Sequence, residues 1–594
     1  MYGSDALAGV VAFTTVEPAD FLKGGGSQAV ELGVAKATAA NGLARSVIAA
    51  ARAARFDLLA GYERSDSSET SNQGSNQGTG TRRTAPNPQS VRGESWIAKA
   101  ALPTAAWGTL SLVWDRYERG VNTDVLSLNP QSSRTVSLLG DDRAERNRVS
   151  FSHEMLALPG VDSLKSLIYH QTSTTRQNTE EVRANTTAAC LSAPGTISCQ
   201  RNAEFRFAQR DSGLTVIGAS TLGARNAHQL VFGAEWARVR SEEQRDGRQT
   251  NLNTGTVSNV VGTDVFPTRD FPITESTRLG AFVQDSVAVP DTPLTLIAGL
   301  RADRFRLTPL PDGIYPSAGH SVASPADSAW SPKLGLLYRL THETTFTAQS
   351  TAGFRAPPYS DVNIGLTNLP LGYTVIANVG LKPETSRGAE LGMRGRHASF
   401  EYDLTAFYTG YHDLIVSRAA LPCPGDPRCV PGTTGTFQSQ NVTRARIFGI
   451  EARARYPFAR GWHAQAGLSA NQGDDLAKNV PLNSIDPSKL VAGVSYDAPD
   501  RNWGSALHLT HAATKSRIDQ AAGTLFAPPS YTIADLVGHL ACGAGCEVNA
   551  GVFNLFDRKY WLWPDVRAIL NPGTSADRYT QPGRSYSAQV RITF

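Results

Sequence analysis

The chain has 594 residues, a formal net charge of only +4, and 41% hydrophobic residues. A charge this small on a chain this long argues against nucleic-acid binding. No run of about 18 uncharged apolar residues is present, so no membrane-spanning helix is expected. The length alone suggests several domains, but no Pro- or Ser-rich linker divides the chain, so the residue pattern has to decide the architecture.

The first 22 residues, MYGSDALAGVVAFTTVEPADFL, do not resemble the start of an exported protein. An export signal opens with positive charges and continues with an apolar core. Here a turn broken by Gly and Ala precedes an apolar run at residues 10–13 and an acidic turn. This opening has the character of the end of a structural unit whose beginning is missing.

Alternation of apolar and polar residues follows along the chain. At the C-terminus, YSAQVRITF places apolar side chains at the even positions 586–594 and polar ones between them. Residues 400–408 and 446–456 show the same pattern. A period of two indicates β-strands with one apolar and one polar face.

About 22 strand-like segments can be traced in this way, with boundaries good to a few residues. They lie near residues 28–38, 43–53, 56–65, 92–102, 108–118, 145–157, 163–175, 203–219, 229–241, 276–289, 294–306, 331–340, 344–354, 386–397, 399–416, 443–457, 462–472, 487–497, 503–514, 530–541, 546–556 and 583–594. Long loops are predicted near 66–91, 176–202, 242–274, 307–329, 355–385, 417–442, 515–529 and 557–582, with short turns in the alternate gaps.

A soluble sandwich also alternates, but three features favour a membrane barrel. The segments are long enough to cross a tilted bilayer, short turns alternate with long loops, and tryptophans such as Trp107 and Trp330 lie near segment ends as in an interfacial girdle. We predict an all-β fold, a transmembrane antiparallel barrel of about 22 strands. A barrel this wide leaks unless its lumen is plugged.

The six cysteines fall in three close pairs: Cys190 with Cys199, Cys423 with Cys429, and Cys542 with Cys546. Close pairs in turn-like sequence indicate local disulfides and an oxidising compartment. Metal binding or free thiols are the alternatives.

The opening segment resembles the last part of the plug domain of TonB-dependent outer-membrane receptors. The matching residues are Tyr2, Gly3, Ser4, Ala6, Leu7, Gly9, Val10 and Val11, with Ala8 where Gly is usual. The resemblance implies a C-terminal remnant of the plug domain at residues 1–25 and an outer-membrane barrel with long extracellular loops at 26–594. The signal peptide, the TonB box and the main plug sheet would then be missing.

Three further stretches are typical of the same family: SPKLGLLYRL (331–340), NVTRARIFGIEARARY (441–456) and GVFNLFDRKYW (551–561). The terminal Phe594 resembles the aromatic C-terminus that the barrel-assembly machinery recognises. The resemblance implies a monomer in the bacterial outer membrane, surrounded by outer-membrane lipid and lipopolysaccharide. Its energising partner would be TonB, acting through the missing plug region.

Within this family the chain resembles the haem and haemoglobin branch. Residues 16–22 (VEPADFL) match a segment that leads from the plug, and residues 354–357 (FRAP) match the first of two boxes that flank one extracellular loop. The second box reads Asn378-Val379-Gly380-Leu381 and matches the family's Asn-Pro-Asn-Leu only at its first and last residues. The ligand-binding candidates are Phe354, Arg355, Ala356, Pro357, Tyr359, Tyr373, Asn378 and Leu381.

The haem branch carries an iron-ligating His between the two boxes, and this chain has none between Pro357 and Asn378. Tyr359 and Tyr373 lie in that loop, and a tyrosine can ligate haem iron. The alternative is that both are ordinary loop or girdle tyrosines. Among the eleven histidines, His320 lies in a long extracellular loop and is the best-placed substitute. Tyr359 and His320 are therefore candidate haem-iron ligands, although a lone loop His is often only solvated.

Three functions follow as hypotheses. The first is a TonB-dependent receptor for haem or haem-protein iron. The second is a receptor for a ferric siderophore or another scarce nutrient. The third is a barrel without energised transport, acting as a passive pore or remaining as a gene remnant. Haem or a ferric chelate would be the transported ligand, with no permanently bound cofactor. No catalytic triad, metal-ligand cluster or phosphate-binding loop is evident, so we do not expect an enzyme.

Overall fold

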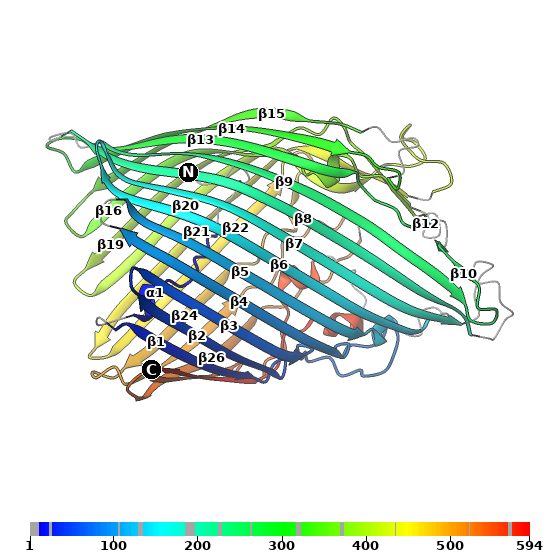
Figure 1. Cartoon of the computed structure of the whole chain (residues 1–594), viewed down its shortest axis with the longest axis horizontal. Helices are drawn as coiled ribbons and strands as arrows, with labels where there is room; N and C mark the ends of the chain where they lie inside the picture. The colour runs from blue at the N-terminus through cyan, green and yellow to red at the C-terminus, as the bar shows by residue number, and fades with distance from the viewer. Residues whose placement is uncertain are drawn as a thin grey trace.

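The computed structural model describes residues 7, 11–22, 26–104, 107–128, 135–184, 197–223, 228–261, 264–315, 322–368, 373–433, 435–521, 523–567, 569 and 573–594. Twenty-two long antiparallel strands form one sheet that closes into a barrel (Figure 1). The strand number predicted from the sequence is confirmed, and each predicted segment corresponds to one barrel strand.

The barrel strands, in chain order, are β1 (Gln28–Ala37), β2 (Gly42–Ala53), β3 (Phe56–Ser68), β4 (Gln89–Thr104), β5 (Gly108–Asp124), β6 (Thr135–Leu158), β7 (Val161–Ala184), β8 (Ile197–Leu222), β9 (His228–Asn251), β13 (Ile273–Ala288), β14 (Leu294–Leu310), β15 (Ala326–Arg339), β16 (Thr344–Arg355), β19 (Glu384–His397), β20 (Phe400–Ala420), β21 (Gly435–Ala459), β22 (Trp462–Asp475), β24 (Lys489–Asp497), β25 (Trp503–Ala512), β26 (Tyr531–Gly543), β27 (Cys546–Phe553) and β28 (Ser585–Thr593).

The connections carry the smaller elements. The short strands are β10 (Val257–Ser258), β11 (Val260–Val261), β12 (Asp264–Val265), β17 (Leu366–Asn368), β18 (Tyr373–Ile376) and β23 (Val480–Pro481). The helical turns are α1 (Pro18–Phe21), η2 (Leu126–Leu128), α2 (Tyr359–Val362), α3 (Trp563–Val566) and η5 (Gly573–Tyr579). None of the described helices is long or apolar enough to span a membrane.

The barrel closes between its first and last strands. β1 pairs antiparallel with β28, with Leu32 opposite Ile592 and Val34 opposite Val590. The pairing continues to the last residue, because the Phe594 N–H donates to the Val30 carbonyl over 2.8 Å. In the described wall of the barrel, closure leaves no free strand edge, which is the condition for strands to lie in lipid.

The two faces of the wall differ as the alternation predicts. On β15, Trp330, Leu334 and Tyr338 are exposed and point away from the lumen, whereas Ser331 between them is buried on the inner side. On β14, Leu296 and Leu300 are exposed, and Arg301 and Asp303 are buried on the inner face. An apolar outer band and a polar inner wall are the arrangement of an outer-membrane barrel.

The strands are longer than the sequence pattern indicates on the side of the long loops. Residues 176–184 and 242–251, predicted as loop, are the ends of β7 and β9, and residues 197–202 open β8. Those loop predictions were wrong at their boundaries. Both faces of these extensions carry polar residues such as Asn178 and Arg248, so no period of two marks them.

Short turns lie at one end of the barrel and most of the long loops at the other, which identifies the periplasmic and extracellular ends. The turn between β26 and β27 contains only residues 544–545, whereas residues 356–383 join β16 to β19. In Figure 1 the short strands β10 and β12 mark the extracellular end, and the C-terminus lies at the opposite end.

The described N-terminal segment, residues 11–22, contacts the first strands. The Glu17 carboxylate lies 2.8 Å from the Lys99 ammonium of β4, which is buried. Leu22 packs in a small cluster with Ala29 and Ala50. These contacts hold α1 against the wall beside β1, β2 and β3.

Candidate ligand site

The chain folds inward after β16. We call residues 356–368, including α2, the inner platform. Pro357 and Pro358 follow the end of β16 and lack backbone N–H groups, so they cannot continue the ladder. The platform packs on the inward-facing side chains of β14 and therefore lies on the lumenal side of the wall.

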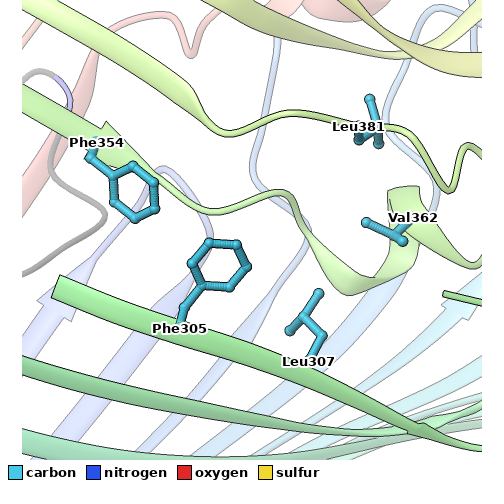
Figure 2. Close-up of a cluster of buried hydrophobic side chains, with 5 residues drawn as sticks. All are labelled: Phe305, Leu307, Phe354, Val362 and Leu381. Atoms are coloured by element: carbon cyan, nitrogen blue, oxygen red, sulfur yellow. The ribbon is translucent and has the colours of Figure 1, made fainter. Parts of the chain in front are cut away.

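A buried hydrophobic cluster fixes the base of the platform. It contains Phe305, Leu307, Phe354, Val362 and Leu381, each no more than 7% exposed. Figure 2 shows the rings of Phe354 and Phe305 turned toward one another and Val362 lying above Leu307. The two ring centroids are 5.8 Å apart. The cluster joins both sequence boxes, because Phe354 belongs to the first and Leu381 to the second.

An ion pair also connects the regions of the two boxes. Arg355 Nη1 lies 3.0 Å from Glu384 Oε2, and the Glu384 side chain is only 2% exposed. The other carboxylate oxygen, Oε1, accepts the N–H of Ile415 on β20 over 2.8 Å. Glu384 was not among the sequence candidates, although its place directly after Leu381, Lys382 and Pro383 is a signal that could have found it.

Buried polar residues hold α2 to the surrounding wall. The Asp361 carboxylate accepts hydrogen bonds from the hydroxyls of Ser417, over 3.0 Å, and Ser439, over 2.8 Å. Asn363 exchanges two hydrogen bonds with the backbone of Ala323. Asp361 and Asn363 were not predicted from the sequence, because an isolated Asp and Asn in a loop have no distinguishing pattern.

Tyr359 lies at the start of α2, with its ring 5.2 Å from that of Phe271. Its hydroxyl lies close to the side chains of Ser241 on β9 and Gln209 on β8, which hydrogen-bond each other over 3.1 Å. Burial raises the pKa of Tyr359 above its usual value, and the neighbouring Ser241 and Gln209 side chains offset part of that rise. The phenol is therefore protonated at neutral pH, and iron ligation would have to displace its proton.

The platform thus connects separate parts of the wall. Tyr359 contacts β8 and β9, and Asp361 contacts β20 and β21, with β13, β14, β15, β16 and β19 between those two pairs. A segment held at both ends in this way covers the lumenal side of the intervening strands. It narrows the path through the barrel at the extracellular half.

The remaining candidates occupy the return path of the same loop. Tyr373 opens β18, which pairs in parallel with the start of β21, and its ring lies 6.2 Å from that of Phe437. Asn378 donates to the Ser439 carbonyl over 2.8 Å and accepts the Gly380 N–H. Pro357 is buried, and Ala356 packs against the cluster. Ligand contact by any of these residues stays a prediction.

His320 lies outside the described residues. Among the described residues, no group of three or more His, Cys, Asp or Glu side chains is placed to hold a metal ion. The predicted haem-iron ligation by Tyr359 or His320 is therefore not tested by this geometry.

Two of the predicted disulfides are formed. Cys423 and Cys429 are bonded in the loop between β20 and β21, with their Cα atoms 5.8 Å apart. Cys542 and Cys546 are bonded across the turn between β26 and β27, with Cα atoms 5.1 Å apart. Cys190 lies outside the described residues, so its pairing with Cys199 stays a prediction.

A closed barrel of 22 tilted strands, apolar outside and polar inside, with a loop folded into its lumen, defines an outer-membrane β-barrel protein. The profile of the family described as TonB dependent receptor-like, beta-barrel matches residues 61–555. The chain belongs to this family, which is a receptor family, and its location is the bacterial outer membrane.

Curated relatives include haemoglobin-binding proteins. Hemoglobin-haptoglobin utilization protein B of Neisseria meningitidis is 28% identical over 341 residues, which cover 50% of this chain and 42% of that protein. Hemoglobin-binding protein A of Haemophilus influenzae is 28% identical over 278 residues, covering 41% of this chain and 27% of that protein. The chain thus spans less than half the length of these relatives.

Solved structures share the architecture. The FrpB iron transporter from Neisseria meningitidis superimposes with a TM-score of 0.69 at 16% identity, over 100% of this chain and 86% of that one. The ferric enterobactin receptor PfeA from Pseudomonas aeruginosa gives a TM-score of 0.68 at 19% identity, over 96% of this chain and 81% of that one. At these identities the likeness shows the fold alone.

Proposed function

We propose that this barrel belongs to a receptor that takes up haem, either free or delivered by a haem protein, for its iron. Extracellular loops would capture the ligand, and TonB would supply the energy for its passage through the plug region. In this proposal residues 1–25 are the C-terminal end of the plug domain and residues 26–594 are the barrel. Haem is the transported ligand, not a resident cofactor, and no catalytic chemistry is required of the chain.

The observation that carries the proposal is the inner platform. A loop that leaves the extracellular rim, enters the lumen and is fixed there by Asp361, Asn363 and the Arg355–Glu384 pair forms the floor of an extracellular vestibule. Tyr359 lies in the platform and Tyr373 follows it at the start of β18, and both bring an aromatic ring and a hydroxyl. Aromatic rings suit the flat apolar face of a porphyrin, and a phenolate oxygen suits ferric iron.

The curated relatives support haem as the ligand class, because one is named for haemoglobin-haptoglobin utilization and another for haemoglobin binding. A ferric siderophore is the alternative within the same transport class. The two ligands differ in shape and in charge. A siderophore complex is bulky and anionic, so its recognition would depend more on arginines than on tyrosine rings.

Binding assays with the whole chain in detergent micelles test the proposal. Haemin, methaemoglobin and ferric enterobactin are titrated separately into the wild type and into Asp361→Ala, which removes the hydrogen bonds to Ser417 and Ser439. We expect the wild type to bind haemin or methaemoglobin, and the variant to bind about tenfold more weakly because the platform loses its anchor. The matched control is Asp403→Ala, which lies on the inner wall far from the platform, at the periplasmic half of β20.

Binding of ferric enterobactin together with no binding of either haem ligand would overturn the haem proposal in favour of a siderophore receptor. Single-channel recording in planar bilayers addresses the passive-pore hypothesis. A large, steady conductance that haemin does not change would support a pore instead of a receptor.

A further inference from the structure

A group of arginines lies on the outward face of the wall, away from the lumen and the platform. The group comprises Arg210 on β8, Arg238 and Arg240 on β9, and Arg304 and Arg306 on β14; we call it the outer arginine patch. All five occupy even positions, in register with the exposed side chains of Leu214, Trp236, Leu296 and Leu300 on the same strands. All are exposed or half-exposed.

The patch lies at the extracellular boundary of the apolar band. Trp236 is two residues before Arg238, and Leu300 is four residues before Arg304, on strands that run toward the extracellular end. On the adjacent β15, Trp330 lies opposite Ala302 and is 67% exposed. Outward-facing tryptophans mark the membrane interface, so the arginines lie at the level of the lipid headgroups.

The register brings these positive charges together. Arg210 and Arg240 face each other directly across β8 and β9. Thr277 on β13 lies opposite Arg238 on one side and opposite Arg306 on the other, so those two arginines flank it in one row. Like charges directly opposite each other destabilise a sheet, so this placement favours an anion from outside the chain.

The chain itself supplies little counter-charge. Glu275 is shared by Arg238, at 2.6 Å, and Arg240, at 3.4 Å. Glu242 lies one row above and is held by Arg269 at 3.3 Å. Arg210, Arg304 and Arg306 form no ion pair with any residue in the described part of the chain.

We propose that the outer arginine patch binds the phosphate groups of a phosphorylated glycolipid in the outer leaflet of the membrane. Arginine is suited to phosphate because its planar guanidinium donates two parallel hydrogen bonds. Clusters of basic residues beside the apolar surface of membrane proteins bind anionic lipid headgroups. A lipid fits better than a free anion, because its acyl chains would lie along the apolar surface formed by Trp236, Leu279 and Leu300.

Native mass spectrometry of the whole chain, released from detergent micelles that contain purified bisphosphorylated lipid A, tests the proposal. The variants are Arg304→Ala with Arg306→Ala, and the matched control is Arg453→Ala with Arg455→Ala, which removes the same charge from the inner wall of β21. Correct folding is checked for each by the heat-dependent shift of the barrel in gel electrophoresis. Neither pair lies in the platform, so the result does not depend on the haem proposal.

We expect the patch variant to bind lipid A about twenty-five-fold more weakly, at roughly fivefold for each arginine lost, and the control variant to bind like the wild type. Replacement of both patch arginines by Lys should restore part of the loss, since the charge remains. Dephosphorylated lipid A should bind weakly to the wild type, and millimolar inorganic phosphate should not displace lipid A. Equal binding by the patch variant, equal binding of the dephosphorylated lipid, or full displacement by inorganic phosphate would overturn the proposal.

Discussion

The guanidinium of Arg355 lies 3.0 Å from the carboxylate of Glu384, and this pair joins the end of β16 to the start of β19 across the base of a 28-residue loop, residues 356–383. Glu384 is buried and Arg355 is half-exposed. Residues that the sequence presents as two separate boxes thus form one structural unit, with the Phe354–Leu381 cluster beside the ion pair.

The first prediction concerns this pair. Arg355→Ala leaves a buried carboxylate whose described partner is the Ile415 N–H, so we expect local stability to fall by about 2 kcal/mol. Hydrogen–deuterium exchange over residues 410–418 should accelerate accordingly. When Glu384 is already replaced by Gln, Arg355→Ala should lower the local stability by much less. An equal effect in both backgrounds would show that the two side chains do not interact.

The second prediction concerns the two faces of β15. Leu334 is exposed on the outer face, four residues from both Trp330 and Tyr338, so it lies near the middle of the bilayer. Leu334→Arg should destabilise the barrel by about 2–4 kcal/mol. Leu337→Arg, on the inner face of the same strand, is the matched control and should lower the stability of the barrel much less. Denaturant unfolding from lipid vesicles measures both, and similar losses would contradict the assigned faces.

The third prediction concerns the orientation of the barrel. Cys423–Cys429 lies in a long loop and Cys542–Cys546 at a short turn, so the two bonds are at opposite ends. In intact cells, a membrane-impermeant phosphine followed by an impermeant maleimide should label Cys423 and Cys429. Cys542 and Cys546 should be labelled only after the outer membrane is permeabilised. Labelling of the second pair in intact cells would reverse the orientation.

The fourth prediction concerns the ionisation of Tyr560, which lies between β27 and α3 with its ring 4.6 Å from that of Tyr531. Burial, with smaller contributions from Tyr531 and Asp535, raises its pKa to about 12. The unfolded chain loses this proton near pH 10, so the contribution to stability is complete below that pH. It is lost as the pH rises from about 10 toward 12.

Ultraviolet difference titration between the wild type and Tyr560→Phe measures this ionisation directly. The difference spectrum should show one phenol that titrates about two pH units above a free tyrosine. A difference that titrates near pH 10 would show that Tyr560 is solvated.

The number and approximate positions of the barrel strands could be predicted from the sequence because one face of each strand contacts lipid. The even positions of residues 586–594 and the outward residues of β15 must be apolar, and the opposite face is polar, so a period of two appears. Where the strands extend beyond the membrane on the extracellular side, their outer face no longer has to be apolar. The outer ends of β7, β8 and β9 are polar on both faces, and their length depends on cross-strand pairing such as Asn178 with Glu204, which no single segment displays.

The candidate site was predictable only in part. The loop between residues 357 and 378 was identified, and both boxes lie in one place. The residues that hold the loop, Glu384, Asp361 and Asn363, form their contacts with strands distant in sequence. Such long-range pairings leave no local pattern in the sequence. The Arg355–Glu384 ion pair and the contacts of α2 with the barrel wall could therefore be identified only from the structure.

Haem binding is tested most directly by the absorption spectrum of haemin titrated into the purified chain, compared with Tyr359→Phe and Tyr373→Phe. We expect a sharpened Soret band that saturates with the wild type, and a shifted or weakened band when the ligating tyrosine is replaced. A Soret band that stays that of free haemin throughout the titration, while a ferric siderophore binds to the same preparation, would contradict the haem proposal.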